Sequence, residues 1–380
     1  MNAKEGLRGV VVGTTRLSRV RAEEGELSYA GYDIRELAEH ATFEHVCHLL
    51  WHGSLPDETA AASLSARLLA ESAVADRILE ITRSLAADGH AMAVLRTAVS
   101  AEGCADPDTG DLSFEAGLRK AIRLTARTVT LTAAIGRLGM GRGPIGPRPD
   151  LGLAANFLYM LHEREPDTEA GRALDIALVL HAEHGMNAST FAARVAAATL
   201  TDVHSAVVAA MGALAGRLHG GANEWVMRML MEVESPERAG EWVRETIGRG
   251  DRIMGFGHRA YRAIDPRAPI LERLSRAMQE RNGDTRWSDV SSAIRRAVEA
   301  EMAARGRTLY PNVDFYSASL YHALGIPVEL FPCMFACARM AGWTAHIMEQ
   351  HRNNTLIRPE VEYTGPNGRS IETTLGRAAS

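Results

Sequence analysis

The sequence contains little lysine, few aromatic residues and no long apolar run. Lys4 and Lys120 are the only lysines among 42 basic residues, so arginine supplies the rest. No basic stripe is present and the formal net charge is −5, so we do not expect a nucleic-acid partner. Aromatic residues make up 6% of the chain and alanine is abundant. This composition favours helices over a β-sandwich.

Cysteine is also scarce. The four cysteines, Cys47, Cys104, Cys333 and Cys337, are too few for a disulfide framework in a chain of 380 residues. Cys333 and Cys337 lie one helical turn apart in an apolar stretch, which is more typical of core packing than of a metal site. A secretory signal is not apparent, and no stretch has 18 uncharged apolar residues. We therefore expect a cytoplasmic location and no membrane partner.

The pattern of apolar residues predicts a mainly α fold with a short β hairpin near the N-terminus. The hairpin is expected from β-like runs at 15–20 and 26–32, on either side of Glu23-Glu24-Gly25. Apolar spacings of three and four predict helices from there on. These predicted helices cover residues 43–50, 61–69, 91–99, 118–138, 151–162, 169–182, 188–200, 203–216, 220–232 and 328–350. The tail from His351 is expected to be irregular.

Several common catalytic motifs are missing. Gly139-Met140-Gly141-Arg142-Gly143 follows no strand and lacks the dinucleotide-binding spacing, so it is interpreted as a loop. The sequence has no Walker phosphate loop, no Gly-x-Ser-x-Gly elbow and no His-Glu-x-x-His motif. A nucleotide-binding fold and a serine hydrolase therefore have no support.

Four short polar segments, called polar islands below, lie within otherwise apolar or glycine-rich sequence, and two of them contain the histidines considered first. In the first, His181 and His184 are three residues apart, so on one helix they would share a face and could bind zinc; a structural polar cluster is the alternative. In the second, His219 precedes Gly220-Gly221 and a predicted helix. Glycines let a ligand approach the backbone, and the positive end of the helix dipole would keep the imidazole neutral. A neutral His219 could donate a hydrogen bond to a developing enolate; a structural histidine is the alternative.

Two further islands carry arginines and a carboxylate. Residues 253–267 combine a Gly-x-Gly turn with His258 and arginines, which makes an anion site plausible beside the simpler interpretation of exposed arginines. Asp314 lies among aromatic residues in Tyr310-Pro311-Asn312-Val313-Asp314-Phe315. It could cap a helix, or apolar neighbours could raise its basicity for work as a general base. Arg339 lies in an apolar predicted helix, where a buried guanidinium needs an anionic partner.

Together these islands resemble the citrate synthase family. The matching motifs occur in the family's order and spacing, and they are His184-Gly185-Met186-Asn187-Ala188-Ser189-Thr190-Phe191, His219-Gly220-Gly221-Ala222-Asn223-Glu224, Gly255-Phe256-Gly257-His258, Asp265-Pro266-Arg267 and Pro311-Asn312-Val313-Asp314. The resemblance extends from Gly6 to Pro359 and covers almost the whole chain. Arg8 and Arg217 depart from the usual pattern, which has glutamate near the first position and often proline at the second.

The resemblance implies a helical two-domain fold and a homodimer. The large domain would comprise residues 1–218 and 324–380, and the small domain, on the acyl-CoA side, residues 219–323. The implied activity is that of an acyltransferase, which condenses acetyl-CoA with oxaloacetate and hydrolyses the citryl thioester to citrate and CoA. The CoA thioester would be a substrate, and neither a metal nor a tightly bound cofactor is expected.

The resemblance also assigns roles to individual residues. Asp314 would be the base that removes a methyl proton, and neutral His219 would donate a hydrogen bond to the thioester oxygen. His258 would polarise the oxaloacetate carbonyl and protonate the new alkoxide. The oxaloacetate ligands would be His184, Arg267, Arg339 and, from the partner subunit, Arg358. CoA would meet Arg262 through a phosphate and the backbone of Gly255, Phe256 and Gly257 through its adenine.

Three alternatives remain. A 2-methylcitrate synthase, which uses propionyl-CoA, would share every one of these residues, and one methylene changes discrimination by only about 1–3 kcal/mol. A metal-dependent hydrolase would use His181 and His184 as zinc ligands. A catalytically silent binding protein of the same fold is the third, and the intact set of His219, His258 and Asp314 argues against it.

Overall fold

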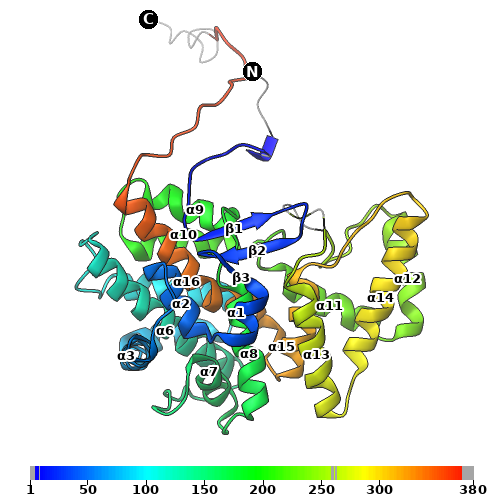
Figure 1. The fold of residues 1–380 in the computed structure, drawn as a ribbon, viewed down its shortest axis with the longest axis horizontal. Helices are drawn as coiled ribbons and strands as arrows, with labels where there is room; N and C mark the ends of the chain where they lie inside the picture. The colour runs from blue at the N-terminus through cyan, green and yellow to red at the C-terminus, as the bar shows by residue number, and fades with distance from the viewer. Residues whose placement is uncertain (1–4, 8, 258–260, 262, 370–380) are drawn as a thin grey trace, which may run out of the picture.

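The computed structural model describes residues 5–7, 9–257, 261 and 263–369. Most of this chain is helical, and a small sheet lies near the N-terminus (Figure 1). The helices are α1 (Ile34–His40), α2 (Phe43–His52), α3 (Glu58–Glu71), α4 (Asp76–Ala86), α5 (Ala91–Gly103), α6 (Phe114–Gly139), α7 (Leu153–His162), α8 (Thr168–His181), α9 (Ala188–Ala197), α10 (Val203–Leu214), α11 (Ala222–Val233), α12 (Ala239–Gly248), α13 (Ala268–Asn282), α14 (Arg286–Ala303), α15 (Val313–Ala323) and α16 (Phe331–Arg352). The prediction of a mainly α fold is confirmed. None of the described helices is long and apolar enough to cross a membrane.

The sheet contains the predicted hairpin and one additional strand. Strands β1 (Ser18–Arg21), β2 (Glu26–Tyr29) and β3 (Tyr32–Asp33) are antiparallel in the order β1-β2-β3. Ser18 pairs directly with Tyr29, so their side chains lie on the same face of the sheet. Strand β3 has two residues, which is too short for an alternating pattern to be visible in the sequence.

Helix α16 passes through the centre of the helical body (Figure 1). It packs against α2, α6, α8, α9 and α10, and its residues are buried on all sides. Such a helix shows apolar residues around its whole circumference rather than on one stripe. Cys337 lies in this core with its Sγ 3.3 Å from Thr132 Oγ1 of α6, and Cys333 is also buried. The predicted packing role of these two cysteines is confirmed.

Helices α11–α14 gather on one side of the molecule, with α15 between them and the rest (Figure 1). Helix α12 packs on α14, and α13 packs on both α14 and α15. The division into a large domain of residues 1–218 and 324–380 and a small domain of residues 219–323 stays a prediction.

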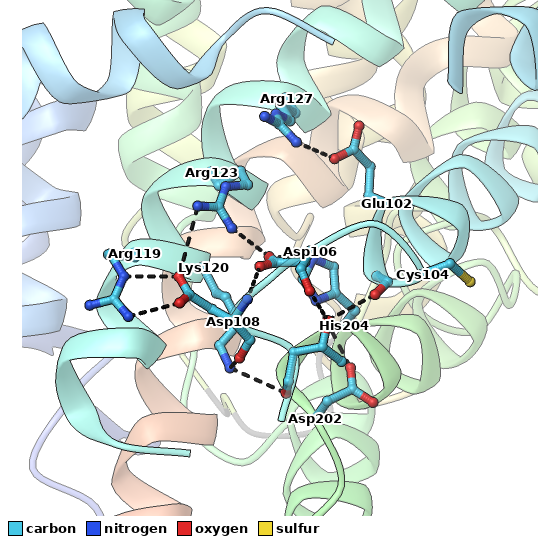
Figure 2. A network of polar contacts seen from close by, with 12 residues as sticks. Glu102, Cys104, Asp106, Asp108, Arg119, Lys120, Arg123, Arg127, Asp202 and His204 are labelled. Carbon is cyan, nitrogen blue, oxygen red and sulfur yellow. Dashed lines mark hydrogen bonds and ion pairs between the residues drawn. The ribbon is translucent and has the colours of Figure 1, made fainter. Parts of the chain in front are cut away.

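A polar network fixes the loop between α5 and α6 (Figure 2). Lys120 of α6 is 0% exposed, and its Nζ donates to the backbone carbonyls of Asp108 at 2.8 Å and Asp111 at 2.6 Å. Arg123, one turn further along α6, pairs with Asp106 at 2.6 Å. The Lys120 ammonium group therefore holds the loop in place through its hydrogen bonds to the loop carbonyls.

The sequence pattern did not predict the short helices α1 and α4, nor α12, α13 and α14. Helix α1 has seven residues and begins where Asp33 Oδ1 accepts a hydrogen bond from Arg35 N at 2.7 Å. Helix α4 buries only Ile78 and Thr82. Helix α1 is too short to show a sustained apolar periodicity, whereas α4 is amphipathic but buries little of its surface.

Candidate active site

The first polar island folds differently from the predicted single helix. Helix α8 ends at His181, and His184 lies in the turn that follows, so the two rings do not share a helix face. His181 Nδ1 donates to Ala177 O at 2.7 Å, and burial lowers the pKa of His181 to about 3. His184 Nε2 lies 3.1 Å from the Tyr261 hydroxyl. Over the ranges that the structure describes, no three His, Cys, Asp or Glu side chains are grouped to hold a metal ion. The geometry therefore does not support the zinc interpretation.

His219 lies in the turn between α10 and α11 and contacts the beginning of α9. Its Nε2 is 3.2 Å from Ser189 N and 2.8 Å from Ser189 Oγ. A backbone N–H can only donate, so Nε2 is an acceptor and the proton of the neutral ring is on Nδ1. Burial lowers the pKa of His219 to about 3, and Arg339 shifts it in the same direction. The ring is therefore a neutral N–H donor at neutral pH, and burial is the main cause.

The glycines after His219 have a packing role. A Cβ on Gly220 would lie 2.3 Å from Leu214 Cδ1, and one on Gly221 would lie 2.8 Å from Ala215 O. Both contacts are with the end of α10, so the glycines let this turn pack closely against that helix. This close packing accounts for Gly220 and Gly221, and their proposed role in making room for a ligand stays a prediction.

Asp314 lies in the first turn of α15 but is not its cap. The cap is Asn312, whose Oδ1 accepts from Asp314 N at 3.0 Å. Asp314 Oδ1 is buried and has no hydrogen-bond partner among the described residues. Burial raises the pKa of Asp314 to about 7, although the positive charges of Arg267 and Arg339 oppose this shift. A carboxylate with a free oxygen and such a pKa is suited to general-base work near neutral pH.

The positive charges of two buried arginines, Arg267 and Arg339, act on the Asp314 carboxylate. The two side chains differ in their hydrogen-bond partners. Arg267 is 2% exposed and makes a two-pronged ion pair with Asp265, with Nη2–Oδ2 at 2.7 Å and Nε–Oδ1 at 2.9 Å. Arg339 is 1% exposed, and its Nε donates to His181 O at 2.7 Å. Its Nη1 has no hydrogen-bond partner in the described ranges, and burial lowers the pKa of Arg339 to about 10. Arg339 therefore keeps its charge at neutral pH and has one N–H group open to an anion.

The aromatic ring of Phe335 is the common neighbour of these groups. The Arg339 guanidinium carbon lies 4.9 Å from the centre of this ring. The ring centres of His181 and His219 lie 4.7 Å and 6.2 Å from it. One apolar side chain of α16 thus holds together a histidine from α8, a histidine from the turn before α11 and an arginine from its own helix.

The Gly-x-Gly turn lies against the beginning of α15. Asn312 N donates to Gly255 O at 2.8 Å, and Gly257 N donates to Tyr310 O at 2.8 Å. Gly255 has φ +78°, and a Cβ there would lie 2.9 Å from Phe315 Cβ. The ring centres of Phe256 and Phe315 are 4.7 Å apart. The turn is therefore next to Asp314, as its predicted place in the site requires, while its contact with CoA stays a prediction.

Arg358 does not join the other predicted ligands within its own chain. It is exposed in the tail that follows α16 and runs away from the helical body (Figure 1). His258 and Arg262, predicted for the oxaloacetate carbonyl and for CoA, lie outside the described residues, as does Arg8. The structure thus brings together His184, His219, Arg267, Asp314 and Arg339.

Comparison with known proteins decides the family. A family model described as "Citrate synthase, C-terminal domain" matches residues 6–360. The chain belongs to the citrate synthase family. The citrate synthase 2 of Bacillus subtilis (strain 168) is 46% identical over 368 residues, which cover 97% of both chains. A 2-methylcitrate synthase of Mycobacterium tuberculosis (strain H37Rv) is 43% identical over 373 residues, 98% of this chain and 93% of that one.

Solved structures agree with this membership. The citrate synthase of the archaeon Thermoplasma acidophilum, solved as a ternary complex with carboxymethyl coenzyme A and oxaloacetate, has a TM-score of 0.92 and 29% identity. The alignment covers 96% of this chain and 97% of that one. The predictions of a citrate synthase family enzyme, an acyltransferase, and of its helical fold are therefore confirmed.

The candidate site also contains residues whose roles the sequence did not reveal. Ser189 Oγ accepts from the Trp343 indole Nε1 at 3.1 Å and lies 2.8 Å from both Asn187 Oδ1 and His219 Nε2. The backbone N–H of Ser189 donates to His219 Nε2 at 3.2 Å. Tyr261 contacts His184 by its hydroxyl and by its ring. Ser189 and Tyr261 do lie within the polar islands, but their roles depend on segments that meet only in the folded chain.

Proposed function

We propose that this chain is a citrate synthase, which condenses acetyl-CoA with oxaloacetate and, with water, releases citrate and CoA. One observation carries the proposal within this family. A carboxylate with a free buried oxygen, Asp314, and a neutral imidazole with its Nδ1–H available, His219, share a site with the unpaired guanidinium edge of Arg339. This combination suits removal of a proton next to a carbonyl and binding of an anionic second substrate.

The first step would be removal of a methyl proton from acetyl-CoA. Asp314 Oδ1 would take the proton, and the pKa of about 7 makes it a stronger base than an exposed aspartate while leaving it largely ionised at pH 8. The negative charge that develops on the thioester oxygen would be stabilised by His219 Nδ1–H. Such a donor contributes on the order of 10²–10³-fold to the rate. The enolate carbon would then attack the ketone carbon of oxaloacetate.

Oxaloacetate would be held by His184, Arg267 and Arg339. Arg267 already has the Asp265 carboxylate as its partner, whereas Arg339 has no ion pair among the described residues. We infer that one substrate carboxylate binds the open Nη1 edge of Arg339, because a buried guanidinium gains most from a new anionic partner. His258 would polarise the ketone and protonate the alkoxide, a role that rests on its motif.

CoA would bind as a substrate and not as a resident cofactor. The turn Gly255-Phe256-Gly257 supports this placement because it is fixed next to Asp314, and Arg262 would contact a CoA phosphate. In the proposed two-domain arrangement, residues 219–323 form the small domain and carry this acyl-CoA side of the site.

The protein would act as a homodimer in which Arg358 completes the site of the other subunit. The tail that carries Arg358 exposes apolar side chains, with Leu356 58%, Val361 91% and Tyr363 67% exposed. An extended segment with exposed apolar groups gains stability when a second chain covers it. A cytoplasmic location also stays part of the proposal.

A thiol-release assay with oxaloacetate tests the function. Acetyl-CoA should give a higher kcat/KM than propionyl-CoA, and Asp314→Asn should abolish thiol release with both. The mycobacterial relative, at 43% identity over 98% of this chain, supports 2-methylcitrate synthase as the second candidate. An equal or higher kcat/KM with propionyl-CoA would establish that candidate, and no thiol release with either substrate would contradict both.

A further inference from the structure

The β1–β2 hairpin lies against the two segments that carry proposed oxaloacetate ligands. Strand β2 buries Leu27 and Tyr29 in the core, and the hairpin also makes polar contacts outside the sheet. Ser18 and Tyr29 pair across the hairpin and lie on one face. Both reach residues 179–185, which end α8 and carry His184.

Tyr29 holds the backbone of this turn with a single hydroxyl group. The side chain is 0% exposed, and its hydroxyl lies 2.8 Å from Glu183 O, 3.2 Å from Glu183 N and 3.2 Å from Val179 O. The hydroxyl thus contacts both backbone groups of Glu183, and Tyr29 fixes this residue from β2, one residue before His184.

Ser18 holds the same turn through a side chain. Its Oγ donates to Glu183 Oε1 at 2.8 Å and accepts from Gly185 N at 3.0 Å. Glu183 Oε1 in turn lies 3.0 Å from His346 Nε2 of α16, and both of these side chains are 0% exposed. The residues on both sides of His184 are thus fixed between β1 and α16.

The tip of the hairpin touches the second segment. Gly25 has φ +65°, and a Cβ there would lie 2.7 Å from Ile264 O and 3.2 Å from Ala263 Cβ. Ala263 and Ile264 directly precede Asp265, whose carboxylate orients Arg267. The same hairpin therefore contacts the turn that carries His184 at one end and the approach to Arg267 at the other.

We propose that the β1–β2 hairpin is a positioning element for oxaloacetate, in which Tyr29 and Ser18 hold His184 in its binding orientation. The inference rests on the proposed role of His184 as an oxaloacetate ligand. Neither Tyr29 nor Ser18 needs to touch the substrate. Their loss should weaken oxaloacetate binding and leave proton abstraction by Asp314 intact.

The test compares Tyr29→Phe and Ser18→Ala with wild type. Each variant removes hydrogen bonds and keeps the packing of the side chain, so we expect Kd and KM for oxaloacetate to rise roughly two- to tenfold. The kcat at saturating oxaloacetate and the KM for acetyl-CoA should stay within twofold of wild type. Kd is measured by titration calorimetry with oxaloacetate alone, and KM and kcat by thiol release.

Matched controls separate positioning from stability. Ser28→Ala and Tyr32→Phe make the same chemical changes in the same sheet, at side chains with no hydrogen bond to residues 179–185 among those that the structure describes. Leu68→Ala opens a cavity in the core at α3, where the side chain is 1% exposed. All three controls should keep the wild-type Kd for oxaloacetate, even where the unfolding temperature falls.

His184→Ala distinguishes the failure of this inference from the failure of the proposed site. If His184→Ala weakens oxaloacetate binding while Tyr29→Phe and Ser18→Ala bind as wild type does, the hairpin proposal is wrong and the ligand assignment stands. If His184→Ala itself binds oxaloacetate normally, both are wrong. A fall in kcat without a change in Kd for the hairpin variants would also overturn the positioning role.

Discussion

Replacing Asp314 with asparagine should abolish turnover and stabilise the folded protein at the same time. Burial raises the pKa of Asp314 from an ordinary value of 3.8 to about 7. The folded protein therefore favours the protonated carboxyl group. Ionisation of Asp314 at pH 8 lowers the free energy of unfolding. Asparagine has nearly the same shape as that protonated group and carries no charge, so the variant avoids this cost but has no base.

The sign and the size follow from proton linkage. Because the pKa is raised in the folded state, wild type loses stability as pH rises from about 4 to about 7, and loses no more above that. A shift of about 3 pH units at about 1.36 kcal/mol each gives an advantage for the variant of about 4 kcal/mol at pH 8. For a chain of 380 residues this corresponds to about 5 °C in unfolding temperature. At pH 5.5 the advantage should fall to about half.

Differential scanning calorimetry at pH 5.5, 7 and 8 measures this difference, and thiol release measures turnover. Asp76→Asn is the matched control, since Asp76 also lies in the first turn of a helix but is exposed, and this variant should match wild type at every pH. An Asp314→Asn variant that is no more stable than wild type at pH 8, or equally stabilised at all three values, would refute the burial argument. Turnover within tenfold of wild type would rule out Asp314 as the base.

Three further predictions test the remaining parts of the site. His219→Ala should bind oxaloacetate but lose deuterium exchange at the acetyl methyl group, and undiminished exchange would contradict the enolate role. Arg358→Ala should cost about 2–5 kcal/mol of transition-state stabilisation. Heterodimers of Arg358→Ala with Asp314→Asn should regain about half of wild-type activity, because one site would carry both defects and the other site would carry neither. Inactive heterodimers would place Arg358 in its own chain's site. Oxaloacetate should compact the molecule in small-angle scattering, because His184 and Arg339 lie outside residues 219–323 and Arg267 lies inside, and an unchanged radius of gyration would count against closure.

The sequence predicted the parts of the structure that depend on local pattern. The hairpin and helices such as α6 and α10 follow from spacing and residue type, and the structure contains them. The end of α8 could not be predicted in the same way. It depends on Tyr29, whose hydroxyl approaches from a strand about 150 residues earlier in the chain.

The candidate site shows the same limit. The motifs place His219 and Asp314 in the site, but the tautomer of His219 depends on its contact with Ser189 N, 30 residues away. The sequence did not indicate a role for Phe335, because an aromatic residue in an apolar helix is typical of a protein core. It is core, and it contacts His181 and His219 only because α8 and the turn before α11 meet α16 there.

The burial of Lys120 has a practical consequence for work with this protein. Its ammonium group is enclosed by backbone carbonyls, so amine-directed reagents cannot reach it while the loop between α5 and α6 stays folded. Lys4 is the one other lysine in the sequence. Amine-reactive dyes and cross-linkers should therefore leave Lys120 unmodified in the folded protein, and labelling at Lys120 would report directly that this loop has opened.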